Sequence, residues 1–448
     1  MIQRRFLTLL LVVILQVSCG IPWFGVKIET GPLDQAYFNT LALNPMKICT
    51  PHMFGDVWDI VKRDSYRNPS NLDLYIWALE GLAVATKPQG PILLKDFYKQ
   101  NPSKFRVWAA LQQLLPVSTR NMSDLCYAAI SGIITGLDDK WASFTTAVEG
   151  EKRMRTMVGE AEYAGLGFIM HVFYKEKRVF VEYVRPGSPA ERGGLRKNDE
   201  LISINGQVIK EMPALNKAHF SFRGPAGTIA TIVLIRHGKG TILLPIIRGK
   251  VDNSDVGCSM IGNTPYCRVV GFGANTVRDF EKNFEALPEH SKKIILDLRD
   301  NPGGLVFSGT GLLSRLWIGT KFATIFARGP DEIVPYNDSY RQILLGGYKA
   351  VVLTNELSAS TSELFAAAVK DYSLAKIIGT KTFGKGISQK TTFRYGAVVT
   401  ISSRFFLSPR GNLFHGIGIH PDILVSLSLS DRENNRDPQL EAALKYLQ

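Results

Sequence analysis

The chain has 448 residues, and its 53 lysines and arginines against 40 aspartates and glutamates give a formal net charge of +13 and a pI near 9.4. A hydrophobic fraction of 45% and a charged fraction of 21% exclude a disordered or fibrous chain, and the length allows two or three domains. The basic residues are dispersed without a long run, so their excess indicates a solvated surface, and we expect no nucleic-acid partner.

The N-terminus has the pattern of an export signal. Arg4 and Arg5 precede an apolar run over residues 6–15 that is too short for a comfortable membrane span and suits a signal-peptide core. Cys19 then ends a stretch that resembles the lipobox of bacterial lipoproteins and is a candidate for lipidation, although Gln16 stands where leucine is usual. Plain signal cleavage and an uncleaved anchor remain alternatives. We expect an exported protein, in the periplasm or cell envelope, whose only membrane contact is through this N-terminus.

The other cysteines suit an oxidising compartment, because four remain once Cys19 is set aside. The segment "CSMIGNTPYC" indicates a hairpin with Gly262-Asn263 as its turn, and this register places Cys258 opposite Cys267. A disulfide and two reduced cysteines fit this hairpin equally well. A pairing of Cys49 with Cys126 follows only by elimination.

The pattern of apolar residues predicts a multidomain α/β protein with a helical N-terminal region and a β-rich module. The expected segments are a signal peptide over 1–19, a linker over 20–45, a helical region over 46–158, a β-rich module over 159–250, an α/β core over 251–425 and a C-terminal helix over 426–448.

The β-rich module begins with "GLGF", and "SPAERGGLRKNDELISINGQ" follows with a hairpin turn at Asn205-Gly206. Together these stretches resemble a PDZ domain of the bacterial type. The resemblance implies that a peptide's terminal carboxylate binds the backbone N–H groups at Gly165, Leu166, Gly167 and Phe168, and that the peptide adds as a strand to the sheet edge. Arg223 resembles a PDZ arginine that couples peptide binding to activation in some relatives, but an exposed turn arginine explains it equally well.

The segment "NELSASTSELFAAAVKD" raises the question of a nucleophile, because three serines precede an alanine-rich helix. Ser360 and Glu363 fit the S-x-x-E capping box, so this stretch alone favours a helix cap. Ser358 and Ser362 are expected to be turn and first-turn residues.

A nucleophilic serine needs a base, and the sequence offers two kinds. Spacing alone leaves open a triad with His415 or His420, because triads are assembled in space. Lys385 lies between two glycines and could serve if its amine were neutral. Residues 379–385 also fit G-x-x-x-x-G-K, but the Ser or Thr of a P-loop is missing and the following residues are strand-like, so a nucleotide site is disfavoured.

Several motifs in order, "DLRDNPGG", "NELSASTSELFAAAVKD", "TFGKGISQ" and "GIGIHPDI", closely resemble the carboxyl-terminal processing, or tail-specific, proteases from about residue 120 to the end. The resemblance implies a catalytic core of the crotonase/Clp-protease-like type. It also implies roles for individual residues: Ser360 as nucleophile, Lys385 as general base, Gln389 as the group that orients the lysine, and an oxyanion hole from Gly303 or Gly304 with Thr361.

The sequence therefore predicts an exported serine endopeptidase that holds protein C-termini in its PDZ domain and cleaves with a Ser360/Lys385 dyad, with no cofactor, metal or nucleotide. A catalytically inactive PDZ adaptor on a protease scaffold is the main alternative, and a histidine-dependent hydrolase is a second. The partners expected are protein or peptide substrates with exposed C-termini, and an adaptor or a second copy could bind the N-terminal helices.

Overall fold

A computed structural model describes residues 49–448 except 88–89, 148, 151–163, 213–221, 252–253, 318–322, 327–331 and 335–343. The signal, the linker and Cys19 lie outside the described residues. The chain divides into two compact units. One unit contains the helical region together with residues 387–405, and the other contains the β-rich module, most of the α/β core and the C-terminal segment.

The four longer helices described in the helical region begin at side-chain caps. Its elements are α3 (Pro51–Asp64), α4 (Asn71–Ala85), α5 (Gly90–Leu93), η1 (Phe97–Lys99), α6 (Lys104–Leu114), η2 (Leu115–Val117) and α7 (Met122–Gly136). Ser70, Ser103 and Asn121 accept backbone N–H groups at the starts of α4, α6 and α7, as N-caps do. The helices α4 and α7 approach closely because Gly81 and Gly132 face each other, where an added Cβ would meet backbone atoms within 3.0 Å.

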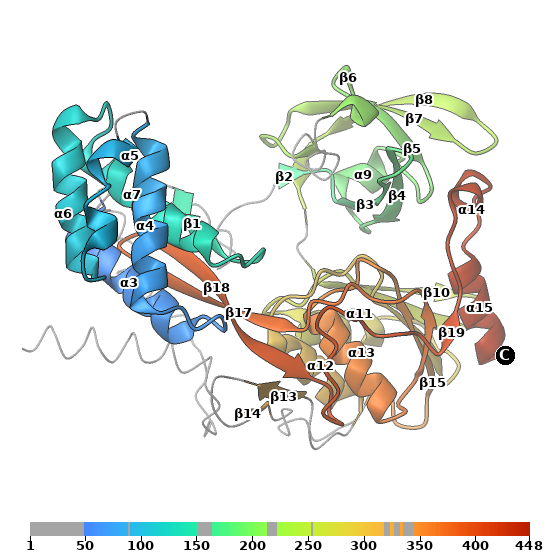
Figure 1. The fold of residues 1–448 in the computed structure, drawn as a ribbon. Coiled ribbons are helices and arrows are strands. Elements are labelled where there is room, and N and C mark those ends of the chain that lie inside the picture. The colour runs from blue at the N-terminus through green and yellow to red at the C-terminus, as the bar shows by residue number, and fades with distance from the viewer. Residues whose placement is uncertain are drawn as a thin grey trace, which may run out of the picture. The chain divides into compact units, whose positions relative to one another are not determined.

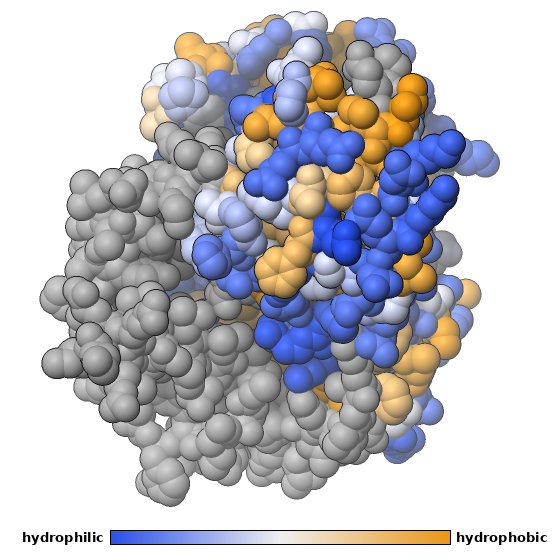
Figure 2. Space-filling model, turned by 60° about the vertical axis from the view of Figure 1, so that its left-hand side comes forward, coloured by the Kyte–Doolittle hydropathy of each residue, from blue (hydrophilic) through white to orange (hydrophobic). Residues whose placement is uncertain are grey.

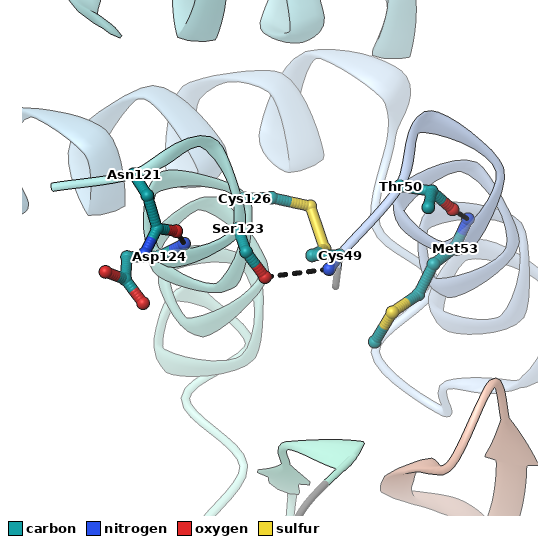
Figure 3. The surroundings of a disulfide bond; sticks show 7 residues. All are labelled: Cys49, Thr50, Met53, Asn121, Ser123, Asp124 and Cys126. Carbon is teal, nitrogen blue, oxygen red and sulfur yellow. Dashed lines mark hydrogen bonds between the residues drawn. A yellow bond between two sulfur atoms is a disulfide. The ribbon is translucent and has the colours of Figure 1, made fainter. Parts of the chain in front are cut away.

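A disulfide fixes the start of this region to α7 (Figure 3). Cys49 and Cys126 are bonded, and both are buried. The backbone N–H of Cys49 also donates to Ser123 Oγ at 2.8 Å. The first described residue is therefore tied to a helix 77 positions later in the chain.

A β-hairpin from the expected α/β core packs with the helices, which the sequence analysis did not predict. The strands are β17 (Ile387–Arg394) and β18 (Ala397–Leu407), and β1 (Ser143–Thr145) pairs antiparallel with β18. Ala397, Val399 and Ile401 are buried in the same hydrophobic cluster as the helices. The α/β core expected over 251–425 thus has its hairpin at 387–405 in the helical unit.

The β-rich module is an antiparallel sheet of the order β3-β4-β5-β7-β8, with β6 on β5 and a separate β2–β9 pair. Its elements are β2 (Ala164–Gly165), β3 (Phe168–Phe173), β4 (Arg178–Val184), α9 (Pro189–Arg192), β5 (Glu200–Ile204), β6 (Gln207–Val208), η3 (Ile209–Glu211), β7 (Ile229–Arg236), β8 (Gly240–Ile247) and β9 (Gly249–Lys250). Asn205 and Gly206 both have positive φ, as the predicted two-residue turn requires. The strand β3 lies at one end of this sheet, next to the "GLGF" loop.

The α/β core is a mostly parallel sheet of the order β10-β11-β12-β15-β16-β19. These strands are β10 (Val256–Ile261), β11 (Thr264–Val269), β12 (Lys293–Asp297), β15 (Lys349–Thr354), β16 (Lys376–Gly379) and β19 (Ile423–Leu424), and β13 (Ala323–Phe326) and β14 (Glu332–Val334) lie between β12 and β15 in the chain. Cys258 and Cys267 are opposite each other in the β10–β11 hairpin and form a disulfide.

Helices cover both faces of the core sheet, because parallel neighbours need crossover connections. The helices α11 (Thr276–Glu285), α12 (Val306–Leu316) and α13 (Thr361–Asp371) belong to the cluster that contains Ile294 and Leu296 of β12. Ile295, between them, belongs to the cluster formed with α15 (Pro438–Leu447). This alternation is the two-sided burial expected of such a sheet.

The predicted C-terminal helix is two helices, α14 (Leu429–Glu433) and α15 (Figure 1). Arg178 of β4 pairs with Glu433, and Lys197 pairs with Asp437 at 2.7 Å. Arg432 also pairs with the buried Glu182. The C-terminal segment therefore contacts the β-rich module through charged side chains.

The coloured part of the face drawn in Figure 2 has hydrophobic residues between hydrophilic ones. No helix among the described residues combines the length and the apolar composition needed to cross a membrane.

Candidate active site

Ser360 lies in a constrained turn between β15 and α13. It is the N-cap of α13, with φ 58° and ψ −116°, which a residue with a side chain rarely adopts. The Glu363 N–H donates to the Ser360 carbonyl oxygen at 2.8 Å, and the Glu363 carboxylate accepts the Ser360 N–H. The backbone of Ser360 therefore contributes to the start of the helix.

The two neighbouring serines have local hydrogen bonds. Ser358 Oγ donates to the Leu298 carbonyl at 2.8 Å, and Ser362 Oγ donates to the Asn301 carbonyl at 2.9 Å. Both side chains are buried and join the turn to the loop after β12. Their contacts support the structural role that the sequence analysis gave them.

Glu363 joins the Ser360 turn to the segment that carries Lys385. Its Oε2 accepts the backbone N–H groups of Ser360 at 2.9 Å and Lys385 at 2.7 Å. Its Oε1 accepts Thr382 Oγ1 and Gly384 N, both at 2.6 Å. Burial raises the pKa of the Glu363 carboxyl, while these four hydrogen bonds oppose that rise. The sequence analysis identified Glu363 only as half of a capping box.

Lys385 lies in an irregular segment, and the glycines on both sides of it are close to the backbone of residues 415–416. The Gly416 N–H donates to the Gly384 carbonyl, and an added Cβ at Gly386 would lie 2.7 Å from His415 N. The strand β17, not a helix, follows this segment. A P-loop would open a helix, so the disfavoured nucleotide interpretation does not fit the structure.

The loop after β12 lies directly against Ser360. Gly303 has φ 98°, and a Cβ added there would lie 2.7 Å from Ser360 Cβ. Its N–H donates to Asn301 Oδ1 at 2.9 Å, whereas Thr361 Oγ1 donates to the Gly304 carbonyl at 2.8 Å. Because the Gly303 N–H already has an acceptor, Gly304 is the better of the two candidates for an oxyanion donor beside Thr361.

A buried set of charges supports that loop. Asp300, just before Asn301, has φ 60° and accepts hydrogen bonds from Arg268 at 3.0 Å and Asn355 at 3.0 Å. Burial alone would raise the pKa of Asp300, but His171, Arg268 and Asn355 outweigh it and lower that pKa. These residues were not predicted from the sequence, because ion pairs between distant segments leave no local pattern.

The remaining site candidates are described by their own elements and contacts. Gln389 belongs to the helical unit, where its Nε2 donates to the Trp141 carbonyl at 2.8 Å. Arg223 is exposed in the β-rich module. The His420 carbonyl accepts from Lys370 at 2.6 Å, while His415 lies beside Gly386.

The "GLGF" loop has the backbone shape of a tight binding loop. Gly167 has φ 81°, and an added Cβ would lie 2.6 Å from Ser188 Cβ. Leu166 is buried, and its carbonyl accepts the Ala190 N–H at 2.7 Å. Phe168 stacks edge-on against Phe222 with ring centroids 4.9 Å apart. The loop is thus held between α9 and the end of β3.

Comparison with known proteins places these features in a family. Residues 263–425 match peptidase family S41, and residues 180–236 match a PDZ domain. The chain thus contains a peptidase S41 region and a PDZ domain. The resemblance to carboxyl-terminal processing proteases and the multidomain fold with its PDZ domain are therefore confirmed.

Individual relatives agree with these two matches. A "probable CtpA-like serine protease" of Staphylococcus aureus is 31% identical over 310 residues, or 68% of this chain and 61% of that protein. Its counterpart in Staphylococcus epidermidis is 31% identical over 338 residues, or 75% of this chain and 63% of that protein. The matches thus span less than two thirds of these relatives.

One solved structure is similar over most of its length. The photosystem II D1 C-terminal processing protease is 25% identical, with a TM-score of 0.50 over 80% of this chain and 94% of that one. An S41-type protein from Bacteroides fragilis, 15% identical with a TM-score of 0.51 over 87% of this chain and 96% of that one, shares the fold.

Proposed function

We propose that the chain is an exported serine endopeptidase that holds a protein C-terminus in its PDZ domain and cleaves peptide bonds with a Ser360/Lys385 dyad. One observation carries the proposal: a single oxygen of Glu363 accepts the backbone N–H groups of both residues. Two segments distant in sequence are thereby held together, and each carries one of the two groups that the chemistry needs.

The reaction begins when the neutral amine of Lys385 takes the proton of Ser360 Oγ, which attacks the scissile carbonyl carbon. The N–H groups of Gly304 and Thr361 stabilise the resulting oxyanion. The Thr361 N–H lies at the start of α13, and the Gly304 N–H lies in the glycine turn beside Ser360. The C–N bond then breaks, and the leaving amine takes the proton from Lys385.

Deacylation repeats these steps with water. Lys385 takes a proton from the water, the oxygen attacks the ester carbonyl at Ser360, and the C–O bond to Ser360 breaks as Lys385 returns the proton to Ser360 Oγ. The product leaves as a carboxylic acid that ionises in water. In this proposal Gln389 orients Lys385. The role is testable, since Gln389→Ala should lower kcat more than KM.

The PDZ domain supplies the substrate contact in this proposal. The strand β3 is at a sheet end and follows the Gly165–Phe168 loop, which is the arrangement that strand addition uses. The substrates are proteins with exposed apolar C-termini, and Arg223 reports peptide binding to the catalytic core. Export through residues 1–19, with or without a lipid on Cys19, brings the enzyme to such substrates in the cell envelope.

Cleavage assays test the dyad directly. An unfolded protein with an apolar C-terminus, and the same protein with a charged C-terminus, are incubated with wild type, Ser360→Ala and Lys385→Ala. We expect wild type to cleave the apolar-tailed substrate faster and both variants to lose at least about 1000-fold in kcat. Lys381→Ala, an exposed lysine in the same segment, is the matched control and should remain active. Equal cleavage by wild type and both variants would contradict the dyad.

The same assay separates the two alternatives. A PDZ adaptor would bind the apolar tail without cleavage by any form. A histidine-dependent hydrolase is the second candidate because the backbone of His415 lies close to Gly386, next to Lys385. It predicts that His415→Ala abolishes cleavage while Lys385→Ala does not.

A further inference from the structure

One side chain of the PDZ domain contacts the loops on both sides of Ser360. His171 belongs to β3, the strand that follows the Gly165–Phe168 loop. Its Nδ1 lies 2.9 Å from Asp300 Oδ1, and its Nε2 lies 3.9 Å from Glu356 Oε1. The side chains of His171 and Asp300 are only 8% and 5% exposed, while that of Glu356 is 60% exposed. The contact with Asp300 is therefore the one shielded from water.

The direction of this hydrogen bond follows from the acceptor. An ionised carboxylate can only accept, so Nδ1 of His171 carries the proton and donates to Asp300. Arg268 Nη2 donates to the other oxygen of Asp300 at 3.0 Å. A hydrogen bond to a charged group inside a low-dielectric interior is among the stronger ones.

Asp300 needs this support because its backbone is strained. It has φ 60°, a left-handed conformation that residues with a side chain rarely adopt. Its N–H donates to Asn355 Oδ1 at 2.9 Å, and Asn355 Nδ2 donates back to Asp300 Oδ1 at 3.0 Å. The side chain that His171 holds is thus the link between the Gly303-Gly304 loop and the Ser360 turn.

The next residue carries the link to the proposed oxyanion hole. The Asn301 carbonyl accepts the Ala359 N–H at 2.9 Å, and Asn301 Oδ1 accepts the Gly303 N–H. A change in Asp300 would therefore displace Gly303 and Gly304 relative to Ser360.

We infer that His171 is a positioning residue for catalysis: through Asp300 it holds the Gly303-Gly304 loop in place beside Ser360. The PDZ domain then contributes to the shape of the active site as well as to tail binding. This inference rests on the proposed function, because it assigns His171 to the reaction of Ser360.

Four variants test the inference in the full chain. His171→Ala removes the Nδ1 donor, and His171→Asn keeps a donor at nearly the same place, because Asn Nδ2 is as many bonds from Cα as His Nδ1. His237→Ala is the matched control, since His237 is a second PDZ histidine whose Nδ1 lies 2.7 Å from a carbonyl of the C-terminal segment, at Glu433. Ser360→Ala reports the background.

Two substrates separate positioning from tail binding. One is a short chromogenic peptide ester, which has no free C-terminal carboxylate for the PDZ loop to hold, and the other is an unfolded protein with an apolar C-terminus. We expect His171→Ala to lose about 10- to 100-fold in kcat on both, with KM within about twofold, because a displaced oxyanion loop weakens only the transition state. His171→Asn should recover most of the loss, and His237→Ala should match wild type.

Several outcomes would overturn the inference. An unchanged kcat on the ester, with slower protein cleavage, would mean that His171 only serves tail binding or domain docking. Faster hydrolysis of both substrates by His171→Ala would make the contact inhibitory. A loss that His171→Asn does not recover, or that His237→Ala shares, would assign the effect to domain packing. If wild type and Ser360→Ala are equally inactive on both substrates, the proposed function fails as well, whereas a Ser360-dependent reaction untouched by His171→Ala leaves that function standing.

Discussion

The backbone N–H groups of Ser360 and Lys385 donate to the same oxygen atom, Oε2 of Glu363. The backbone nitrogens of Ser360 and Lys385 therefore lie no farther apart than the sum of these two hydrogen-bond lengths. The other oxygen of Glu363 accepts hydrogen bonds from Thr382 and Gly384. The carboxylate therefore accepts four hydrogen bonds, which is what an acceptor-only group can do. A buried side chain with this set of contacts fixes the backbone on which the proposed dyad is built.

Glu363→Gln should therefore impair both activity and stability. In either orientation the new amide places an NH₂ group against two donors, which leaves buried N–H groups unsatisfied. We expect about 2–3 kcal/mol lower stability in urea unfolding and about 100-fold lower kcat. Glu281→Gln is the control, because it removes a half-exposed carboxylate paired with Arg315 and should cost at most about 1 kcal/mol. Normal kcat in Glu363→Gln would show that the carboxylate does not position the dyad.

Gly303→Ala should block the site without unfolding the core. The new Cβ would lie 2.7 Å from both Ser360 Cβ and the Ala359 carbonyl oxygen, and the residue has φ 98°. We expect at least about 100-fold lower kcat, since the loop must move away from Ser360. Gly347→Ala is the control, because Gly347 also has positive φ, at 78°, but nothing lies within 4 Å of its added Cβ.

The two glycine variants separate strain from contact. Gly347→Ala should lose about 1–2 kcal/mol in chemical unfolding from its backbone alone and keep wild-type kcat. If Gly303→Ala keeps its kcat as well, Gly303 does not stand against the reacting serine in solution.

Local patterns predicted much of the fold. Apolar runs located β12 and β15, turn residues located the hairpin at Gly262-Asn263, and S-x-x-E located the start of α13. The sequence could not predict that the hairpin at 387–405 packs with the helical region, because its alternating pattern fits any half-buried sheet. It also could not predict His171 beside Asp300, since that contact depends on how two domains pack.

The two disulfides should differ in their effect on stability. The Cys49–Cys126 bond closes 77 positions and the Cys258–Cys267 bond closes 9. In the chain-entropy account, loss of the longer link costs about 4–5 kcal/mol and loss of the shorter about 2–3 kcal/mol. Cys126→Ser should therefore lower the melting temperature more than Cys267→Ser, measured by calorimetry without reductant. Reductant should lower the melting temperature of wild type to that of a variant that carries both substitutions. An unchanged melting temperature of wild type would mean that both cysteine pairs were already reduced.

Acid should destabilise the protein through Asp437, which the C-terminal segment places between Arg299 and Lys197. Burial alone would raise the pKa of Asp437, but the two cations outweigh it and hold that pKa well below the ordinary 3.8. A carboxyl group whose pKa is lower in the folded than in the unfolded chain stabilises the fold at pH values above its unfolded-state pKa. This stability is lost as the pH falls through its folded-state pKa. Asp437→Asn keeps the capability to cap α15 at Leu440 but has no charge to lose.

We therefore expect Asp437→Asn to be about 2–3 kcal/mol less stable than wild type at pH 7, and the difference to shrink as the pH falls from about 5 to about 2. Urea unfolding at a series of pH values measures this difference directly. Asp138→Asn is the control, because Asp138 is 96% exposed and its replacement should leave the pH profile unchanged. The other buried carboxylates lose stability equally in both proteins, so the difference between the two curves belongs to Asp437. A difference in unfolding free energy that stays constant across the whole pH range would mean that Asp437 acts only as a neutral cap. Arg299 would then pair with another carboxylate.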